Sequence, residues 1–312
     1  MQIGLIGLGR MGMNMGRRLI QGKHRIIAYN RTRERTRQIA KEGAQGAFSL
    51  PELVQCLKPP RILWLMLPAG KPVDQHIEQL QALLSHGDII VDGGNSFYQD
   101  DIRRAQELKP YGIHYLDVGV SGGVWGLTIG YCLMIGGNRK IFRHLRPIFK
   151  ALAPKEGYLY CGEAGAGHFV KMIHKGIEYG MMSAYGEGFD LLQASPYGEQ
   201  LDFGKVAHLW NQGSVIRSWL LELLEAALRA DKDLSAIKGF VEDSGEGRWR
   251  VRQALESAVP APVIAASLFQ RFRSRQTDPF SDRILAALRN QFGGHAVFKR
   301  KAQGSRRRAQ IR

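Results

Sequence analysis

Residues 3–12 read IGLIGLGRMG, an apolar run that leads directly into three glycines spaced as GxGxxG. The run is typical of a buried strand, and the apolar residues after it recur at helical spacing. In such a loop Gly7 permits a tight turn, Gly9 lets a pyrophosphate approach the backbone, and Gly12 lets the helix pack against the strand. The spacing alone is a weak signal that an ordinary turn also explains. In this context it predicts a dinucleotide site with contacts from Gly7, Leu8, Gly9, Arg10, Met11 and Gly12.

The alternation of strand and helix continues from this motif to about residue 162. Apolar runs predict strands at 3–6, 25–29, 62–67, 88–92, 114–118, 131–135 and 158–161. Helical spacing predicts helices between them at 11–21, 33–42, 73–84, 99–109 and 139–151. Strands that alternate with helices form a mostly parallel sheet covered on both faces. We therefore expect an α/β fold in which residues 1–162 form a Rossmann-type, doubly wound NAD(P)-binding domain.

The pattern changes after about residue 162, where strand-like runs end. One long helix is expected at 166–194, followed by shorter helices at 206–210, 215–229, 249–257 and 284–291. This spacing indicates an all-helical domain over residues 163–298. Residues 299–312, KRKAQGSRRRAQIR, are strongly basic, and we expect them to form a disordered tail.

Composition narrows the class of protein. The chain has 312 residues, of which 44% are hydrophobic and 23% charged, so it can bury two cores and is not mainly disordered. No run reaches about 18 apolar residues, so we expect no membrane span. The start of the chain shows no secretion signal, and Cys56, Cys132 and Cys161 lack metal-ligand spacing. We expect reduced thiols in a cytoplasmic protein.

The charge balance is strongly basic. The formal net charge is +16, and seven of the excess positive charges lie in the last fourteen residues, which leaves +9 on residues 1–298. A cleft for a polyanionic ligand accounts for such an excess. General adhesion to RNA or DNA is the alternative, although we do not expect nucleic acid to be the partner.

The end of the second predicted strand bears on the choice of cofactor. An NAD-binding domain usually has a carboxylate there, which binds the ribose 2′-hydroxyl. This chain instead has Asn30, Arg31 and Thr32. A guanidinium at this point pairs well with a 2′-phosphate, so the sequence favours NADP. In the alternative, Arg31 is an exposed side chain at the start of a helix and the cofactor is NAD.

Ionisable side chains recur along the predicted long helix, in the segment GHFVKMIHKGIEYG. Lys171, His174 and Glu178 share one stripe because they are spaced by three and four residues. Lys175 and Tyr179 flank that stripe. Charged groups are rarely buried without partners, so the stripe is either solvated surface or a functional site.

Two loops favour the functional alternative. DGGNS at 92–96 and SGG at 121–123 each follow a predicted strand. Open α/β sheets bind their ligands outside the carboxyl ends of the strands. Both loops would therefore face the same crevice as the glycine loop.

These motifs together resemble the 6-phosphogluconate dehydrogenases (decarboxylating), a branch of the β-hydroxyacid dehydrogenases. The matching segments are GLGRMG at 7–12, NRT at 30–32, DGGNS at 92–96, GVSGG at 119–123, the helix at 167–180, IRS at 216–218, GEGRW at 245–249 and RNQFGGH at 289–295. The resemblance covers nearly the whole chain up to about residue 298 and indicates the short form of that family.

The resemblance implies oxidative decarboxylation of 6-phosphogluconate to ribulose 5-phosphate and carbon dioxide in the pentose phosphate pathway, with NADP, or NAD as a second possibility. It implies that Lys171 is the general base and Glu178 the general acid, with no metal. It assigns the nicotinamide contacts to Leu67, Pro68, Ala69 and Asn95. It assigns the contacts of the phosphorylated sugar acid to Asn95, Ser121, Gly122, Gly123, His174, Lys175, Tyr179, Arg217, Arg289 and His295. In relatives the last two reach a partner subunit, which implies that residues 163–298 also form a homodimer or larger homo-oligomer.

The sequence departs from the family pattern at two places. Lys175 stands where the family has Asn, and its charge is expected to favour the neutral form of Lys171. Ser244 and Glu246 replace residues that touch the phosphate, which bears on the identity of the sugar acid. The alternatives are a related β-hydroxyacid dehydrogenase or imine reductase with another small substrate, and a non-catalytic basic Rossmann protein.

Overall fold

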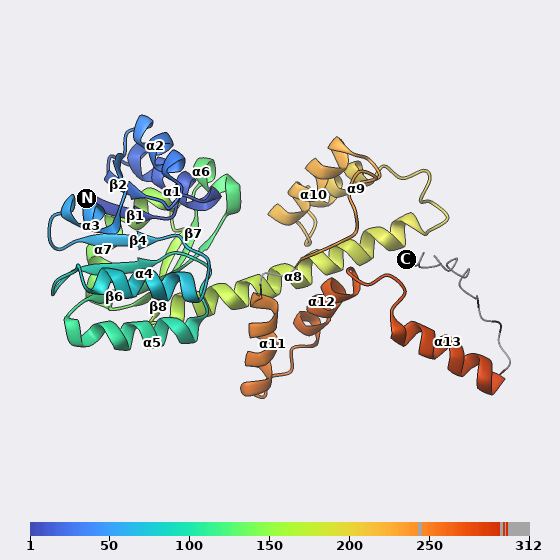
Figure 1. Cartoon of the computed structure of the whole chain (residues 1–312). Helices are drawn as coiled ribbons and strands as arrows, with labels where there is room; N and C mark the ends of the chain where they lie inside the picture. Colours follow the sequence, from blue (N-terminus) through green and yellow to red (C-terminus); the bar gives the residue numbers. More distant parts are fainter. Residues whose placement is uncertain (243–244, 294–295, 297, 299–312) are drawn as a thin grey trace, which may run out of the picture. The chain divides into compact units, whose positions relative to one another are not determined.

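The computed structural model of the chain describes residues 1–242, 245–293, 296 and 298 (Figure 1). These residues form two compact units. The first lies within Met1–Gln200 and Ser244–Ala266, and the second within Leu201–Asp243 and Ser267–Arg312. The division into a dinucleotide domain at 1–162 and a helical domain at 163–298 stays a prediction, and the predicted tail lies outside the described residues.

An eight-stranded sheet organises the first unit (Figure 1). Its strands lie in the order β3-β2-β1-β4-β5-β6-β7-β8, and every neighbouring pair is parallel except β6 and β7. The predicted fold class, a mostly parallel doubly wound sheet followed by helices, is confirmed. The strands are β1 Gln2–Ile6, β2 Arg25–Tyr29, β3 Gln45–Ala47, β4 Ile62–Leu65, β5 Ile89–Asp92, β6 His114–Ser121, β7 Cys132–Gly137 and β8 Tyr158–Gly162.

Seven of these strands match the runs expected from the sequence, and β3 is the one that was missed. With three residues, β3 is too short for its alternation to be told from a loop. The strand expected at 114–118 is longer and continues to Ser121, which carries it into the predicted ligand loop.

Alternate residues of the central strands face two separate hydrophobic cores. Leu5 and Trp64 pack in the core beneath α1 and α7, whereas Ile6 and Leu65 pack in the core beneath α3 and α4. Strands buried on both faces need such near-continuous apolar runs. The helices between the strands are α1 Arg10–Gln21, α2 Arg33–Lys41, α3 Leu50–Gln55, α4 Lys71–Gln81, α5 Tyr98–Leu108, α6 Gly126–Ile129 and α7 Arg139–Leu152, with 3₁₀ turns at Lys109–Tyr111 and Gly123–Trp125.

Beyond β8, which ends at Gly162, the described residues form helices and no strand, as predicted. The predicted helix at 215–229 was wrong at its start, because Ser218 has an extended backbone and its hydroxyl accepts a hydrogen bond from the Leu221 N–H at 3.1 Å. Within the part of the chain described, no helix has both the length and the apolar character needed to cross a membrane. These helices are α8 Ala166–Gln193, α9 Phe203–Asn211, α10 Trp219–Ala230, α11 Glu246–Glu256, α12 Pro262–Arg273 and α13 Phe280–Gly293.

Three glycines let the first turns of α8 lie directly against the sheet. A Cβ on Gly167 would collide with the carbonyl oxygens of Met134 and Asp117. A Cβ on Gly119 would collide with the Cβ of Lys171, and one on Gly136 would collide with the Gly167 nitrogen. Helix α8 therefore contacts the backbone of β6 and β7, which no larger residue at these positions would allow.

We expect the substitution Gly167→Ala to lower the free energy of unfolding of the first unit by about 1 to 3 kcal/mol, because the added methyl group forces the helix away from the sheet. Gly186→Ala is a matched control on the same helix, since nothing lies within 4 Å of its Cβ position. In an open helical position alanine should raise stability by about 0.5 to 1 kcal/mol. Urea denaturation followed by circular dichroism measures both, and equal effects of the two substitutions would contradict the packing described.

Candidate active site

The glycine loop between β1 and α1 is shaped to receive a phosphate. Gly7 has a φ of 95°, which favours glycine, and a Cβ on Gly12 would collide with the Gly7 carbonyl oxygen. In contrast, nothing lies within 4 Å of the Cβ position of Gly9, which is the N-cap of α1. The first N–H groups of the helix therefore face open space at the positive end of its dipole. This loop fits the pyrophosphate of a dinucleotide.

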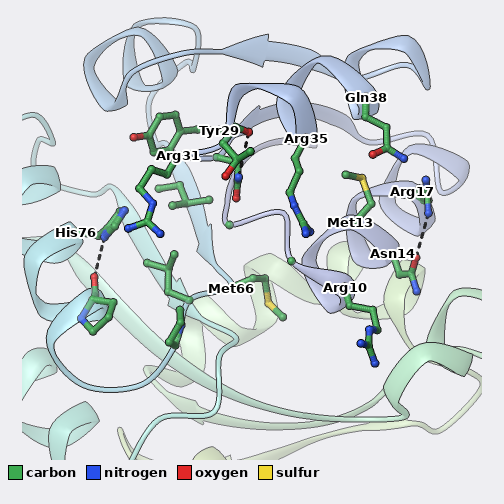
Figure 2. Close-up of a pocket in the computed structure, with 18 residues that line it drawn as sticks. Arg10, Met13, Asn14, Arg17, Tyr29, Arg31, Arg35, Gln38, Met66 and His76 are labelled. Carbon is green, nitrogen blue, oxygen red and sulfur yellow. Dashed lines mark hydrogen bonds between the residues drawn. The ribbon is translucent and has the colours of Figure 1, made fainter.

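A cavity of about 940 Å³ opens beside this loop (Figure 2). Of the predicted cofactor contacts, the structure brings eight together in its lining, namely Gly7, Gly9, Arg10, Asn30, Arg31, Thr32, Leu67 and Pro68. The other five, Leu8, Met11, Gly12, Ala69 and Asn95, are not part of the lining. Leu8 and Gly12 are buried in the packing between strand and helix.

Several basic and polar residues of the cavity were missed from the sequence. Arg35 lies in the first turn of α2, four residues after Arg31, and in Figure 2 both guanidinium groups point into the cavity. Arg31 precedes the helix, so helical spacing gave no signal that connects Arg35 to it. His76 lines the same cavity from α4, and no local pattern connects it to the glycine loop.

Asn30 and Arg35 brace the glycine loop, whereas Arg31 remains free to meet a ligand. The Asn30 Oδ1 accepts a hydrogen bond from the Leu8 N–H at 2.8 Å, and the Arg35 guanidinium donates to the Leu8 carbonyl at 2.7 Å. Arg31 is exposed and makes no hydrogen bond or ion pair with the described part of the chain. Its charge is available for an anion in the cavity.

Lys171, on α8, is buried beside the second predicted ligand loop, at residues 121–123. Its ammonium donates a hydrogen bond to the carbonyl of Val120, the residue before Ser121, and the side chain is nine-tenths buried. The structure thus brings Lys171 to the loop of Ser121, Gly122 and Gly123. Burial lowers the pKa of Lys171, the carboxylate of Glu246 opposes this, and the charge of Lys175 lowers it further. The net effect favours the neutral amine, which is the form that can accept a proton.

The rest of the stripe forms a half-buried ionic cluster. The Lys175 ammonium lies 2.6 Å from the Glu178 carboxylate and 5.5 Å from the centre of the Tyr179 ring. Arg250, on α11, lies 4.3 Å from the centre of the same ring. Burial lowers the pKa of His174, whose Nδ1 is buried without a hydrogen bond in the described residues. The stripe is therefore partly buried and paired, not a solvated face.

DGGNS does not present all its side chains to a ligand. The Asp92 carboxylate accepts hydrogen bonds from the Gly94 N–H at 2.9 Å and from the Ser96 hydroxyl at 2.6 Å. Asp92 and Ser96 are buried, whereas Asn95 is half-buried. The loop is thus held by its own first and last residues, and Asn95 is its candidate ligand contact.

A buried ionic network connects this loop to α8, and sequence reasoning missed it. The Nδ1 of His168 lies 2.7 Å from the Asp101 carboxylate. Asp101 also accepts a hydrogen bond from the Tyr115 hydroxyl at 2.7 Å, and Arg104 lies 3.3 Å from Asp92. All these groups are buried. His168 and Asp101 are 67 residues apart in the chain, so no local sequence pattern predicts that they pair.

The pKa values of the central pair follow from burial and from the surrounding carboxylates. Burial lowers the pKa of His168, but Asp101, Asp92 and Asp117 outweigh this effect and raise it to about 9. Burial raises the pKa of Asp101 to about 6, although His168 opposes the rise. Both groups are therefore charged between about pH 6 and pH 9.

The remaining predicted contacts lie elsewhere in the chain. Arg217, which precedes α10, and Arg289, on α13, belong to the second unit. His295 and Ser244 lie outside the described residues. Glu246 begins α11 in the first unit and is 3% exposed, so this departure from the family pattern places a buried carboxylate near Lys171.

Comparison with known proteins identifies the relatives of the chain. The model of the NAD binding domain of 6-phosphogluconate dehydrogenase matches residues 2–162, and that of the C-terminal domain of the same enzyme matches residues 167–287. YqeC of Bacillus subtilis, provisionally named a 6-phosphogluconate dehydrogenase, is 49% identical over 96% of this chain and 100% of its own. A decarboxylating, NAD(+)-dependent 6-phosphogluconate dehydrogenase of Haloferax volcanii is 43% identical over 96% of this chain and 99% of its own.

A solved structure extends the likeness to the fold. The 6-phosphogluconate dehydrogenase of Plasmodium falciparum, studied with NADP+ and with 6-phosphogluconate, has a TM-score of 0.81 and 30% sequence identity. The match covers 97% of this chain and 67% of the Plasmodium chain. The present chain therefore spans about two thirds of that longer enzyme.

The buried pair predicts a pH dependence of stability. Because folding raises the pKa of His168 from about 6.5 to about 9, its charged form stabilises the fold fully below pH 6.5, and this contribution is lost as the pH rises to 9. We expect the difference in unfolding free energy between the wild type and His168→Gln to shrink by up to about 3 kcal/mol over this range. Denaturant titrations at several pH values measure it. The exposed His144, changed to Gln, is the control, and a difference for His168→Gln that stays constant with pH would refute the ion pair.

Proposed function

The chain belongs to the 6-phosphogluconate dehydrogenase family of NAD(P)-dependent oxidoreductases, and we propose that it converts 6-phosphogluconate to ribulose 5-phosphate and carbon dioxide. The observation that carries this proposal is the buried Lys171, whose ammonium meets the strand-end loop at Val120 and whose pKa is lowered. A base in this position can deprotonate a hydroxyl held by the loop. The named relatives and the shared motifs support the choice of sugar acid.

The cofactor would be held by the glycine loop and the cavity beside it. The open space at Gly9 and the N-terminus of α1 would receive the pyrophosphate, and Arg31 would pair with a 2′-phosphate. A nicotinamide held there would supply the acceptor for the hydride that leaves C3 of the substrate. Arg31 supports NADP as the preferred cofactor, with NAD as the second possibility.

Lys171 performs the first proton transfer. In its neutral form, which burial favours, Nζ takes the proton of the C3 hydroxyl while C3 is oxidised to a ketone. The product is a β-keto acid, in which the bond from C2 to the carboxylate breaks and carbon dioxide leaves. The electron pair of this bond moves toward the C3 oxygen, and the protonated Lys171 stabilises the charge there by a hydrogen bond.

We assign the last proton transfer to Glu178, whose carboxyl group takes up a proton from solvent and gives it to the carbon that lost carbon dioxide. Its carboxylate lies 2.6 Å from the ammonium of Lys175, so any substrate that reaches Glu178 also meets this second cation. We assign Lys175 to the anionic part of the substrate together with His174 and Tyr179. The contacts of Asn95, Ser121, Gly122, Gly123, Arg217, Arg289 and His295 stay predictions, as do the homodimer, the cytoplasmic location and the pathway.

Glu246 favours a second candidate function. Its buried carboxylate stands near Lys171, in the segment expected to touch the phosphate, and a carboxylate repels a phosphate. The alternative is therefore oxidation of a related hydroxyacid that lacks the phosphate group. A panel with gluconate and 3-hydroxyisobutyrate beside 6-phosphogluconate separates the two candidates.

The decisive test is turnover with purified protein. We expect 6-phosphogluconate to support formation of reduced nicotinamide and release of equal amounts of carbon dioxide. Lys171→Met removes the base and keeps the apolar stem, so it should lower kcat at least about a thousandfold with cofactor binding unchanged. If only an unphosphorylated acid is oxidised, the second candidate replaces the first. Full activity of Lys171→Met would remove the proposed base.

Arg31 should determine the preference between the two cofactors. We expect Arg31→Ala to raise the KM for NADP by about 10- to 100-fold and to leave the KM for NAD nearly unchanged, because only NADP loses a charge-assisted hydrogen bond. Arg33→Ala is the matched control, since Arg33 stands two residues later and does not line the cavity. Equal changes of both KM values would contradict this role.

A further inference from the structure

A second cavity, of about 660 Å³, lies on the first unit between α7, β8 and the turn that connects them. It shares no lining residue with the dinucleotide cavity. Its lining contains a single carboxylate, Glu156, beside five cations. These are Arg139, Arg143, Arg146, Lys150 and Lys155.

The cations form a continuous stripe that the helix itself arranges. Arg139, Arg143, Arg146 and Lys150 are spaced by four, three and four residues and so share one face of α7. The opposite face carries Leu145 and Ile148 into the core, and α7 has no acidic residue. Four charges of one sign along one face cost free energy unless an anion compensates them.

These cations lack the partners that other arginines of the unit have. On α5, Arg103 and Arg104 both contact the carboxylate of Asp74 at 2.8 Å. None of the five cations of the second cavity forms an ion pair within the described residues. Their charge is therefore available to a ligand.

Aromatic rings line the same cavity. Phe142, Tyr158 and Tyr160 are half-buried, with the Phe142 ring centre 5.2 Å from that of Tyr160 and 6.3 Å from that of Tyr158. The Tyr160 hydroxyl donates to the Gly137 carbonyl at 2.9 Å, which fixes its ring, and the Arg139 guanidinium lies 5.6 Å from the ring centre. Fixed rings beside guanidinium groups suit a planar base that carries phosphates.

We propose that this second cavity binds a free nucleotide with two or three phosphates, independently of the catalysed reaction. The base packs against the tyrosine rings, and the phosphates meet the stripe of Arg143, Arg146 and Lys150. The cavity is of a size that holds one such ligand. Glu156 also lines the cavity, and its negative charge opposes a continuing phosphate backbone there, which favours a free nucleotide over nucleic acid.

ATP binding to the full chain tests the proposal, with the dinucleotide cavity saturated by NADP. Isothermal titration calorimetry at about 0.15 M salt should detect one further ATP per chain. Arg143→Glu should weaken this binding at least tenfold, whereas Lys140→Glu, a charge reversal on the same helix outside the cavity lining, should change it less than about threefold. Inorganic triphosphate should bind about tenfold more weakly than ATP because it lacks the base.

Four outcomes overturn the proposal. They are the absence of ATP binding at millimolar concentration, equal effects of the two charge reversals, equal affinity for triphosphate and ATP, and tighter binding of a single-stranded oligonucleotide that Arg143→Glu also removes. The last outcome would assign the cavity to nucleic acid. Each measurement is independent of turnover, so it separates this proposal from the proposed reaction.

Discussion

The contact of 2.7 Å between His168 and Asp101 is the constraint on which the position of the candidate base depends. It joins the first turn of α8 to α5 inside the protein, where an unpaired charge would be costly. Asp117 fixes the same turn by accepting the backbone N–H groups of Gly165 and His168 at 2.7 and 2.8 Å. Lys171 follows one turn later on the same helix. Because these contacts fix the helix against the sheet, the Lys171 ammonium is held at the carbonyl of Val120 on β6.

Close packing of helix and sheet also sets the chemistry of Lys171. Because Gly119 and Gly167 have no side chains, the stem of Lys171 lies against backbone and is almost shielded from water. Shielding lowers its pKa, and the neutral amine is the form that a general base needs. The residues that allow this burial of Lys171 are thus glycines, whose contribution is the absence of a side chain.

Local patterns were sufficient to predict most of the sheet and eight of the eighteen residues that line the cofactor cavity. Gly7, Gly9 and Asn30 to Thr32 follow directly from the sequence because a strand, a loop and a helix adjacent in the chain place them. Pairings over long distances were not accessible in the same way. Arg250 beside Tyr179 and His168 beside Asp101 depend on how separate elements pack. In DGGNS the composition suggested a ligand loop, but the geometry shows that Asp92 and Ser96 bond to each other.

The antiparallel pairing of β6 and β7 has a consequence for the direction in which the chain approaches the site. β8 is parallel to β7, so it runs in the opposite direction to β6. The carboxyl end of β8 therefore lies at the end of the strands opposite to Ser121. The helix that follows then passes Asp117 first and Gly119 afterwards, in the same direction as β6. Had β7 been parallel to β6, β8 would run in the same direction as β6 and end on the side of Ser121. A helix after β8 would then begin beside the predicted ligand loop and run away from it. One reversal of chain direction thus makes α8 run toward the predicted ligand loop and places Lys171 beside it.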